Sequence, residues 1–188
     1  MKKIKLIFII LFLILVNSNS NSNELNYLFF KLKNAENFSE ATNIEKKIWN
    51  IWITNGSNQK NNSEMSKGLI LFNNGNLKKA LKVFLNLCEV EPEWAEPFNK
   101  VATIKFLQKD YLTSIKYIKL TLEKERRHFG AISGLAQINL RLGKFENALK
   151  NINEALKIHP FVGIKKIKPI LLEKLNKKEI NFHLNYIN

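Results

Sequence analysis

Apolar residues recur along this chain with helical spacing, and the whole pattern returns every 34 residues. Between positions 145 and 158, for example, the apolar residues fall three and four apart, as on one face of a helix: Ala148, Leu149, Ile152, Ala155 and Leu156. Short polar turns interrupt such stretches at the same interval: Gly75-Asn76-Leu77, Lys109-Asp110-Tyr111 and Gly143-Lys144-Phe145. A fixed period of this length is typical of a protein built from stacked supersecondary units.

The period divides much of the chain into three units, 61–94, 95–128 and 129–162, each predicted to contain two helices joined by a tight turn. Gly75 and Gly143 suit the C-terminal cap of a first helix, where a left-handed backbone costs glycine little. Because proline lacks an amide proton, Pro92 and Pro160 are expected to end the second helix of their units. Such a hairpin cannot bury its own apolar face, so we expect the units to stack.

The unit resembles the tetratricopeptide repeat, which favours small residues at positions 8 and 20, a small residue or Gly at 15, apolar residues at 4, 17 and 24, Ala at 27 and Pro at 32. The matching residues are Gly68, Gly75, Ala80, Phe84 and Pro92 in the first unit, Phe98, Ala102, Tyr111, Ser114 and Ile118 in the second, and Ala136, Gly143, Phe145, Ala148, Ile152, Ala155 and Pro160 in the third. The departures are Glu64 at 4, Leu87 and Thr121 at 27, and Arg126 at 32, and they leave the register intact. The resemblance implies an all-α fold, a right-handed helical-hairpin solenoid with flanking N- and C-terminal helices.

The first residues have the form of an export signal. Met1 to Lys5 contains three lysines, and Leu6 to Val16 is an unbroken apolar run. This is the arrangement of a secretory signal peptide, and it is shorter than the roughly 20 residues that span a bilayer. We therefore expect a signal peptide over 1–18 and an exported or periplasmic protein. No Ala-x-Ala site follows, so the cleavage position stays open, and the alternative is an uncleaved segment that anchors the protein to the inner membrane.

The segments between the signal and the repeats, and after the repeats, have predicted roles of their own. Residues 19–23 form an Asn/Ser spacer, and 24–60 predict a helix pair that is a candidate degenerate repeat. Trp49 and Trp52 on the second of these helices are expected to pack onto the first true repeat, with a ligand platform as the alternative. Residues 163–188 predict a capping helix followed by a tail without clear periodicity, because terminal repeats need a polar outer face.

The chain is strongly basic, with a formal net charge of +14. A basic balance raises the question of nucleic acid as a partner. We expect none, because the lysines are spread over all segments, arginine is scarce, and a predicted export signal removes the protein from the cytoplasm. A weak attraction to an anionic membrane surface stays open.

The sequence does not predict a catalytic, cofactor or metal site. Its single cysteine, Cys88, excludes an intramolecular disulfide and is expected to be buried, with an intermolecular disulfide as the alternative. The histidines do not show the spacing of a metal site, and His128 and His159 lie at unit junctions, where capping or packing explains them. The Gly-rich stretch 130–134 lacks the strand that precedes a phosphate-binding loop. We therefore expect a protein that is not an enzyme.

The resemblance also implies where a binding site would lie, since the first helix of each repeat lines the concave face of such a stack. Asn99 and Gln137 can both donate and accept hydrogen bonds to an extended peptide, and Leu69, Phe72 and Phe106 would supply an apolar floor. A groove filled by the C-terminal helix is the alternative. The full set of candidate peptide-binding residues is Leu69, Phe72, Asn99, Lys100, Thr103, Phe106, Ser133, Gln137 and Arg141.

One known form of peptide binding is excluded by the residues present. Members of the family that clamp a terminal carboxylate use basic and amide side chains at five fixed positions, of which this chain fills only one suitably, with Lys100. The five residues are Met65, Leu69, Lys100, Gly130 and Gly134.

The stretches 98–103 and 127–135 resemble small exported tetratricopeptide proteins of Gram-negative bacteria. This resemblance implies a protein- or peptide-binding adaptor in the cell envelope. The alternative is a self-associating or membrane-surface assembly factor without a peptide ligand.

Overall fold

The computed structural model describes the backbone of residues 22–187 and the side chains of residues 22–177. The predicted signal peptide and most of the Asn/Ser spacer lie outside these residues. All regular elements from 22 to 187 are helices. The chain divides into two compact units after Ile51, and the three predicted repeats belong to the second unit.

The first unit contains a helix over residues 22–33 and most of α2 (Phe38–Ile53), which crosses the boundary. The start of α2 is capped reciprocally: Asn37 Oδ1 accepts the backbone N–H of Glu40, and the Glu40 carboxylate accepts the backbone N–H of Glu36. Such pairing satisfies N–H groups that a helix start leaves without partners. The two predicted apolar stripes are buried: Leu28, Phe29 and Leu32 on the first helix, and Ala41, Ile44 and Ile48 on α2.

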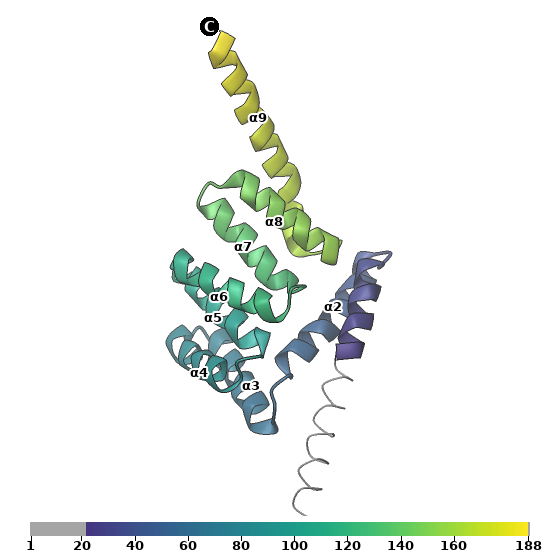
Figure 1. Ribbon diagram of the computed structural model, residues 1–188, viewed down its shortest axis with the longest axis vertical. Helices are drawn as coiled ribbons and strands as arrows, with labels where there is room; N and C mark the ends of the chain where they lie inside the picture. The colour runs from purple at the N-terminus through teal and green to yellow at the C-terminus, as the bar shows by residue number, and fades with distance from the viewer. Residues whose placement is uncertain (1–21, 188) are drawn as a thin grey trace, which may run out of the picture. The chain divides into compact units, whose positions relative to one another are not determined.

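The second unit contains three helical hairpins, one for each 34-residue period. They are formed by α3 (Gln59–Asn73) with α4 (Leu77–Val90), α5 (Ala95–Leu107) with α6 (Tyr111–Lys124), and α7 (Phe129–Arg141) with α8 (Phe145–Ile158). Figure 1 shows them stacked in chain order. The predicted all-α solenoid of hairpins is therefore confirmed.

The turn inside each hairpin uses the same left-handed residue. Gly75, Lys109 and Gly143 have φ angles of 74°, 61° and 70° and occupy equivalent places in the three units. In the first hairpin the N–H groups of Gly75 and Asn76 return to the carbonyls of Phe72 and Leu71, which satisfies acceptors at the end of α3. The two glycines adopt this backbone at little cost, whereas Lys109 adopts it with a side chain present.

Small residues at the helix crossings let the hairpins close, and larger apolar residues fill the layers between hairpins. One buried cluster joins the first hairpin to α5 and contains Met65, Ala80, Phe84, Leu87, Trp94, Val101 and Ile104. A second cluster joins the second and third hairpins and contains Ala102, Ile118, Ala131 and Ile138. Neighbouring hairpins thus share a continuous core, as a stacked-repeat protein requires.

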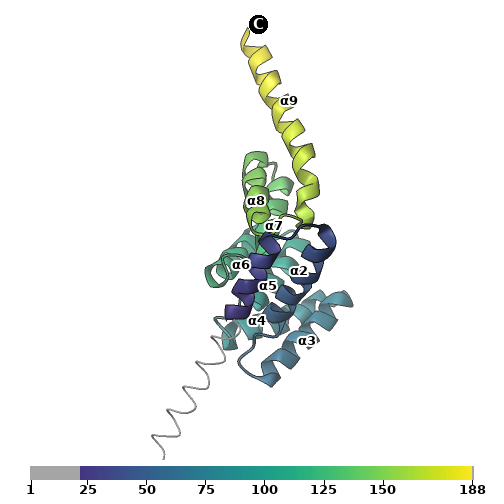
Figure 2. The same cartoon turned by 90° about the vertical axis from the view of Figure 1, so that its right-hand side faces the viewer.

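After the third hairpin, a short 3-10 helix η1 (Gly163–Ile167) leads into α9 (Lys168–Ile187), with Pro169 in the first turn of α9. In the stretch expected to be a tail, the backbone is helical to Ile187, and no glycine or proline after Pro169 interrupts it. Leu171 is buried at the base of α9. In both views α9 extends away from α3–α7, so the alternative in which it fills the concave groove is wrong (Figures 1 and 2).

Over the part of the chain that the structure describes, no helix combines the length and apolar character that crossing a membrane would require.

Candidate functional site

The candidate residues of the first hairpin contribute mainly to the core. Leu69 and Phe72 of α3 are half-buried and pack against the cluster around Phe84 and Trp94. The predicted apolar floor at this end is therefore largely core packing.

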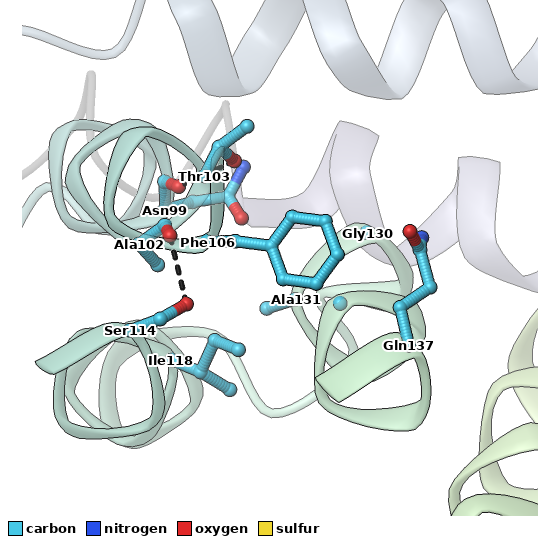
Figure 3. Close-up of a pocket in the computed structure, with 10 residues that line it drawn as sticks. Asn99, Ala102, Thr103, Phe106, Ser114, Ile118, Gly130, Ala131 and Gln137 are labelled. Atoms are coloured by element: carbon cyan, nitrogen blue, oxygen red, sulfur yellow. Dashed lines mark hydrogen bonds between the residues drawn. The ribbon is translucent and has the colours of Figure 1, made fainter. Parts of the chain in front are cut away.

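The second and third hairpins enclose a pocket of about 120 Å³ on their inner side. Figure 3 shows Phe106 reaching from α5 toward α7, with Ile118 and Ser114 of α6 below it. Phe106 is braced by Tyr111, whose ring centroid lies 5.8 Å away. Four candidates from the sequence meet at this pocket, which is lined by Asn99, Ala102, Thr103, Phe106, Ser114, Ile118, Gly130, Ala131, Gly134 and Gln137.

Two hydroxyl groups at the pocket are already engaged by the backbone. Ser114 Oγ donates to the carbonyl of Ala102 at 2.8 Å, which ties α6 to α5 (Figure 3). Thr103 Oγ1 donates to the carbonyl of Asn99, one turn earlier, at 2.9 Å. Their donor protons are used inside the fold, so the polar groups left to recognise a ligand are the carboxamides of Asn99 and Gln137.

The Asn99 side chain belongs to a buried polar network behind the pocket. Asn99 Nδ2 donates to Glu96 Oε2 at 3.0 Å, and His128 Nε2 lies 2.9 Å from the same oxygen. Lys100 Nζ lies 2.8 Å from the other oxygen, Glu96 Oε1. Glu96 and His128 are both fully buried. Lys100 therefore neutralises a carboxylate in the fold, and it is not among the residues that line the pocket.

The same network holds Glu96 in its charged form and His128 in one tautomer. Burial alone would raise the pKa of Glu96, but the Lys100 ammonium and the His128 hydrogen bond outweigh it, so the pKa lies below its ordinary value. His128 Nδ1 accepts the N–H of Ala131 and so caps α7. The nitrogen facing Glu96, Nε2, must then carry the proton.

Trp52 completes the wall around His128. Its indole stacks on the imidazole with ring centroids 4.0 Å apart, and it contacts Phe129 at 5.1 Å. The prediction that this ring packs onto the first repeat was wrong, because it lies at the junction of the second and third. Its neighbour Ile53 does pack on the first core, and the Trp52 carbonyl accepts a hydrogen bond from Trp94 Nε1. A buried, stacked Trp52 is a packing residue and not a ligand platform.

A second depression of about 510 Å³ continues the groove toward η1, and it shares Gln137 with the pocket. It is lined by Gln137, Leu140, Arg141, Gly163, Ile164 and Ile167. Arg141 is exposed there, as predicted for a groove residue. Ser133 instead turns away from both hollows: its Oγ is buried without a hydrogen-bond partner among the described residues.

Sequence reasoning missed two parts of the site: the residues contributed by an outer helix, and the contacts between residues far apart in the sequence. Ile118 and Ser114 of α6 form the pocket floor, although only inner helices were expected to contribute. Glu96 and His128 are 32 residues apart and meet only because successive hairpins stack. The available signal was the spacing of Glu96, Asn99 and Lys100 at i, i+3 and i+4, which places them on one helix face.

The remaining reactive side chains have structural explanations. Burial raises the pKa of the Cys88 thiol to about 12, against a smaller lowering by Lys124, so the thiol stays protonated. His159 is buried, and its Nδ1 accepts the N–H of Phe161. In the described residues no group of three or more His, Cys, Asp or Glu side chains is arranged to hold a metal ion.

Comparison with known proteins agrees with this architecture. The family model described as Tetratricopeptide repeat matches residues 131–161, inside the third hairpin. A TPR repeat-containing protein of Rhizobium etli is 31% identical over 136 residues, which cover 72% of this chain and 66% of the relative. The chain thus spans just under two thirds of that relative's length.

Two solved structures share the fold at low sequence identity. The first TPR of Spaghetti (RPAP3), bound to the HSP90 peptide SRMEEVD, superposes with a TM-score of 0.59 at 19% identity, over 63% of this chain and 94% of that one. The MamA protein superposes with a TM-score of 0.51 at 13% identity, over 85% of this chain and 90% of its own. Both show the similarity of fold.

Proposed function

Because the chain belongs to the tetratricopeptide repeat family, we propose that it is a non-catalytic adaptor whose concave groove binds an extended peptide segment of a partner protein in the bacterial cell envelope. The family's fold is one that serves protein–protein interaction. The observation that carries the proposal is a pair of hollows that have Gln137 of α7 as a common lining residue. The first extends from Gln137 to Asn99 of α5, and the second from Gln137 to Ile164 of η1.

The chemistry of the hollow suits an extended peptide backbone. Gln137 is exposed on α7, and its carboxamide can both donate and accept. Asn99 offers an amide oxygen from α5, and Phe106, Leu140 and Ile164 supply apolar walls. Convergent polar groups in an otherwise apolar groove are what a peptide site requires.

The bound segment is expected to be internal to its protein and not a free C-terminus. Lys100, the one clamp-like cation that the sequence offered, is held by Glu96 at 2.8 Å. Gly130 and Gly134 stand at two further clamp positions and carry no side chain. The similar RPAP3 domain is bound to a peptide, which supports a peptide ligand for this fold, while the residues present here favour a different part of a partner chain.

A photocrosslinking experiment tests the groove. A benzoyl-phenylalanine at Gln137 of the full-length protein, irradiated in cells, should trap a protein partner. The same group at Lys119, which is exposed on the outer helix α6, is the matched control. We expect adducts at 137, fewer at 119, and loss of the 137 adducts in Phe106→Ala. Equal adducts at both positions would contradict the groove assignment.

A second candidate function rests on the outer surface of α6. Leu112 is 84% exposed there, and Lys116 and Lys119 are exposed on the same helix. An apolar side chain among cations suits weak contact with an anionic membrane surface or with a second copy of the chain. Co-sedimentation with phosphatidylglycerol vesicles that Leu112→Ser abolishes, without any adduct at 137, would favour this function over peptide binding.

The envelope location is proposed from the N-terminal segment. Three lysines and an apolar run that begins at Leu6 have the form of an export signal. Fractionation of cells and the mass of the isolated protein test this: loss of about the first 18 residues indicates a cleaved signal, and an intact chain in the membrane fraction indicates the anchored alternative. An intact chain in the cytoplasmic fraction would contradict both.

A further inference from the structure

The pocket between the second and third hairpins owes its volume to a missing side chain at Gly134. A methyl group at this position would meet Ile118 Cδ1 at 3.6 Å, which is an ordinary contact. Gly134 and Ile118 both line the pocket, so that methyl group would enter it. Alanine therefore fits the fold at position 134, and its methyl group would reduce the volume of the pocket.

Neither backbone conformation nor packing requires glycine at Gly134. The residue lies inside α7 and has no positive φ, unlike Gly75 and Gly143 in the turns. Glycine inside a helix lowers stability relative to alanine. What Gly134 provides in return is open space beside the groove.

The side-chain amide of Asn99, which faces this space, is held in one orientation by its hydrogen bond to Glu96. Asn99 is only 6% exposed, and its Nδ2 donates to the ionised Glu96. A reversed carboxamide would place its oxygen against the carboxylate, so Oδ1 must be the atom left toward the pocket. No described residue donates a hydrogen bond to Asn99 Oδ1. A buried side chain thus presents one unsatisfied acceptor at the pocket (Figure 3).

We propose that this pocket is a side-chain subsite, which takes one small aliphatic side chain, of alanine to leucine size, from the bound peptide, while a backbone N–H of that peptide donates to Asn99 Oδ1. The inference rests on the proposed function and specifies which peptide the groove prefers. An engineered cavity of about 150 Å³ can enclose benzene. A pocket of about 120 Å³ that must also admit the connection to a peptide backbone is therefore better matched to an aliphatic group.

The charge of the inner helices indicates what flanks that side chain. Arg141 of α7 is exposed at the second hollow, which shares Gln137 with the pocket, and no acidic side chain lines either hollow among the described residues. Opposite charges across an interface favour association and like charges oppose it. The expected occupant is a neutral to acidic segment.

Selection from a random library tests the subsite without knowledge of the natural partner. A phage-displayed library of random dodecapeptides is selected on the immobilised full-length protein, and selected peptides are synthesised for affinity measurement. We expect alanine, valine, isoleucine or leucine at one fixed position, with aspartate and glutamate enriched around it. Gly134→Ala should weaken these peptides about tenfold or more, because the methyl group displaces the buried side chain. Asn99→Ala should weaken them about fivefold through the lost hydrogen bond.

Two controls separate the subsite from the groove as a whole. Leu112→Ala shortens an exposed side chain on the outer helix α6, outside the groove, and it should leave affinity unchanged. Substituting tryptophan at the fixed peptide position should abolish binding to the unaltered protein. If peptides are selected but bind Gly134→Ala as tightly as the unaltered chain, the groove proposal survives and the subsite is wrong. If the selection enriches no sequence, both proposals are contradicted.

Discussion

Two glycines on inner helices of the stack, Gly68 of α3 and Gly134 of α7, stand in opposite surroundings. A methyl group at Gly68 would lie 2.5 Å from Phe84 Cε1, closer than two non-bonded carbon atoms approach each other in proteins. A methyl group at Gly134 would lie 3.6 Å from Ile118 Cδ1, at ordinary contact distance. The first glycine is required by a packed neighbour, and the second leaves a hollow.

The comparison separates a hairpin layer that is closed from one that is open. Around Gly68 a fully buried phenyl ring fills the space that the glycine leaves. Around Gly134 the space is bordered by the fixed carboxamide of Asn99 and by the ring of Phe106. The same residue type in one repeated architecture thus serves core packing in the first hairpin and an accessible pocket in the third.

The largest expected effect on stability comes from removing the phenyl ring of Phe84, which fills the first layer. Phe84→Ala should lower the free energy of unfolding by about 4 kcal/mol, because it removes buried area and leaves a cavity. Urea unfolding followed by circular dichroism measures this. Exposed Leu112→Ala, on an outer helix, is the control and should change stability little. A small effect of Phe84→Ala would contradict a closed layer.

The second-largest effect on stability is expected from the buried carboxylate of Glu96, which lies behind the pocket of the open layer. Glu96→Gln should lower the free energy of unfolding by about 3 kcal/mol at pH 7, because Lys100 and His128 lose a charged partner. The pKa of Glu96 in the fold lies below its ordinary value of 4.5. The stabilisation is therefore complete well above pH 4.5 and is lost as the pH falls through the lower pKa of the folded state. Urea unfolding of both chains between pH 3 and 7 should show the difference shrinking below about pH 4.5; a difference independent of pH would contradict an ionised Glu96.

Alanine at the closed position should be unfavourable. Gly68→Ala should cost about 2 kcal/mol, because the methyl group forces Phe84 out of its place. The same substitution in a Phe84→Leu background should cost less, since the smaller side chain leaves room. Equal costs in the two backgrounds, measured as a double-mutant cycle of unfolding free energies, would show that the ring is not the cause.

Alanine at the open position should have the smallest effect and the opposite sign. Gly134→Ala should raise the free energy of unfolding by about 0.5–1 kcal/mol, because it gains helix propensity without a clash. Thermal unfolding measured by circular dichroism should show a correspondingly higher Tm. A lower Tm would mean that the methyl group does not fit against Ile118.

The hairpins were predictable because their signals are local and repeated. The period placed Gly75, Lys109 and Gly143 at equivalent turns. A left-handed backbone was predicted for the two glycines and is present at all three residues. The small residues at the helix crossings followed in the same way. Four groove residues also met at one pocket as expected, Asn99, Thr103, Phe106 and Gln137, since the inner helix of each repeat presents a fixed face.

The remaining features depend on how neighbouring hairpins stack, which a period does not specify. Lys100 was predicted to face a ligand and instead pairs with Glu96, whose other oxygen meets His128 from the next hairpin. Trp52 lies outside the periodic region, so no register indicated that it would stack on His128. Gly68 stands at repeat position 8, where a small residue is expected, whereas Gly134 stands at position 6. The register did not indicate whether an added methyl group would fit at either place, which depends on the positions of Phe84 and Ile118.

The most direct test of this account measures stability and peptide binding on the same sample of Gly134→Ala. The account predicts a higher free energy of unfolding together with an affinity for selected peptides that falls about tenfold, because the added methyl group supports the helix and occupies the subsite. Parallel changes, with both properties rising or both falling, would contradict the claim that this glycine keeps a binding pocket open.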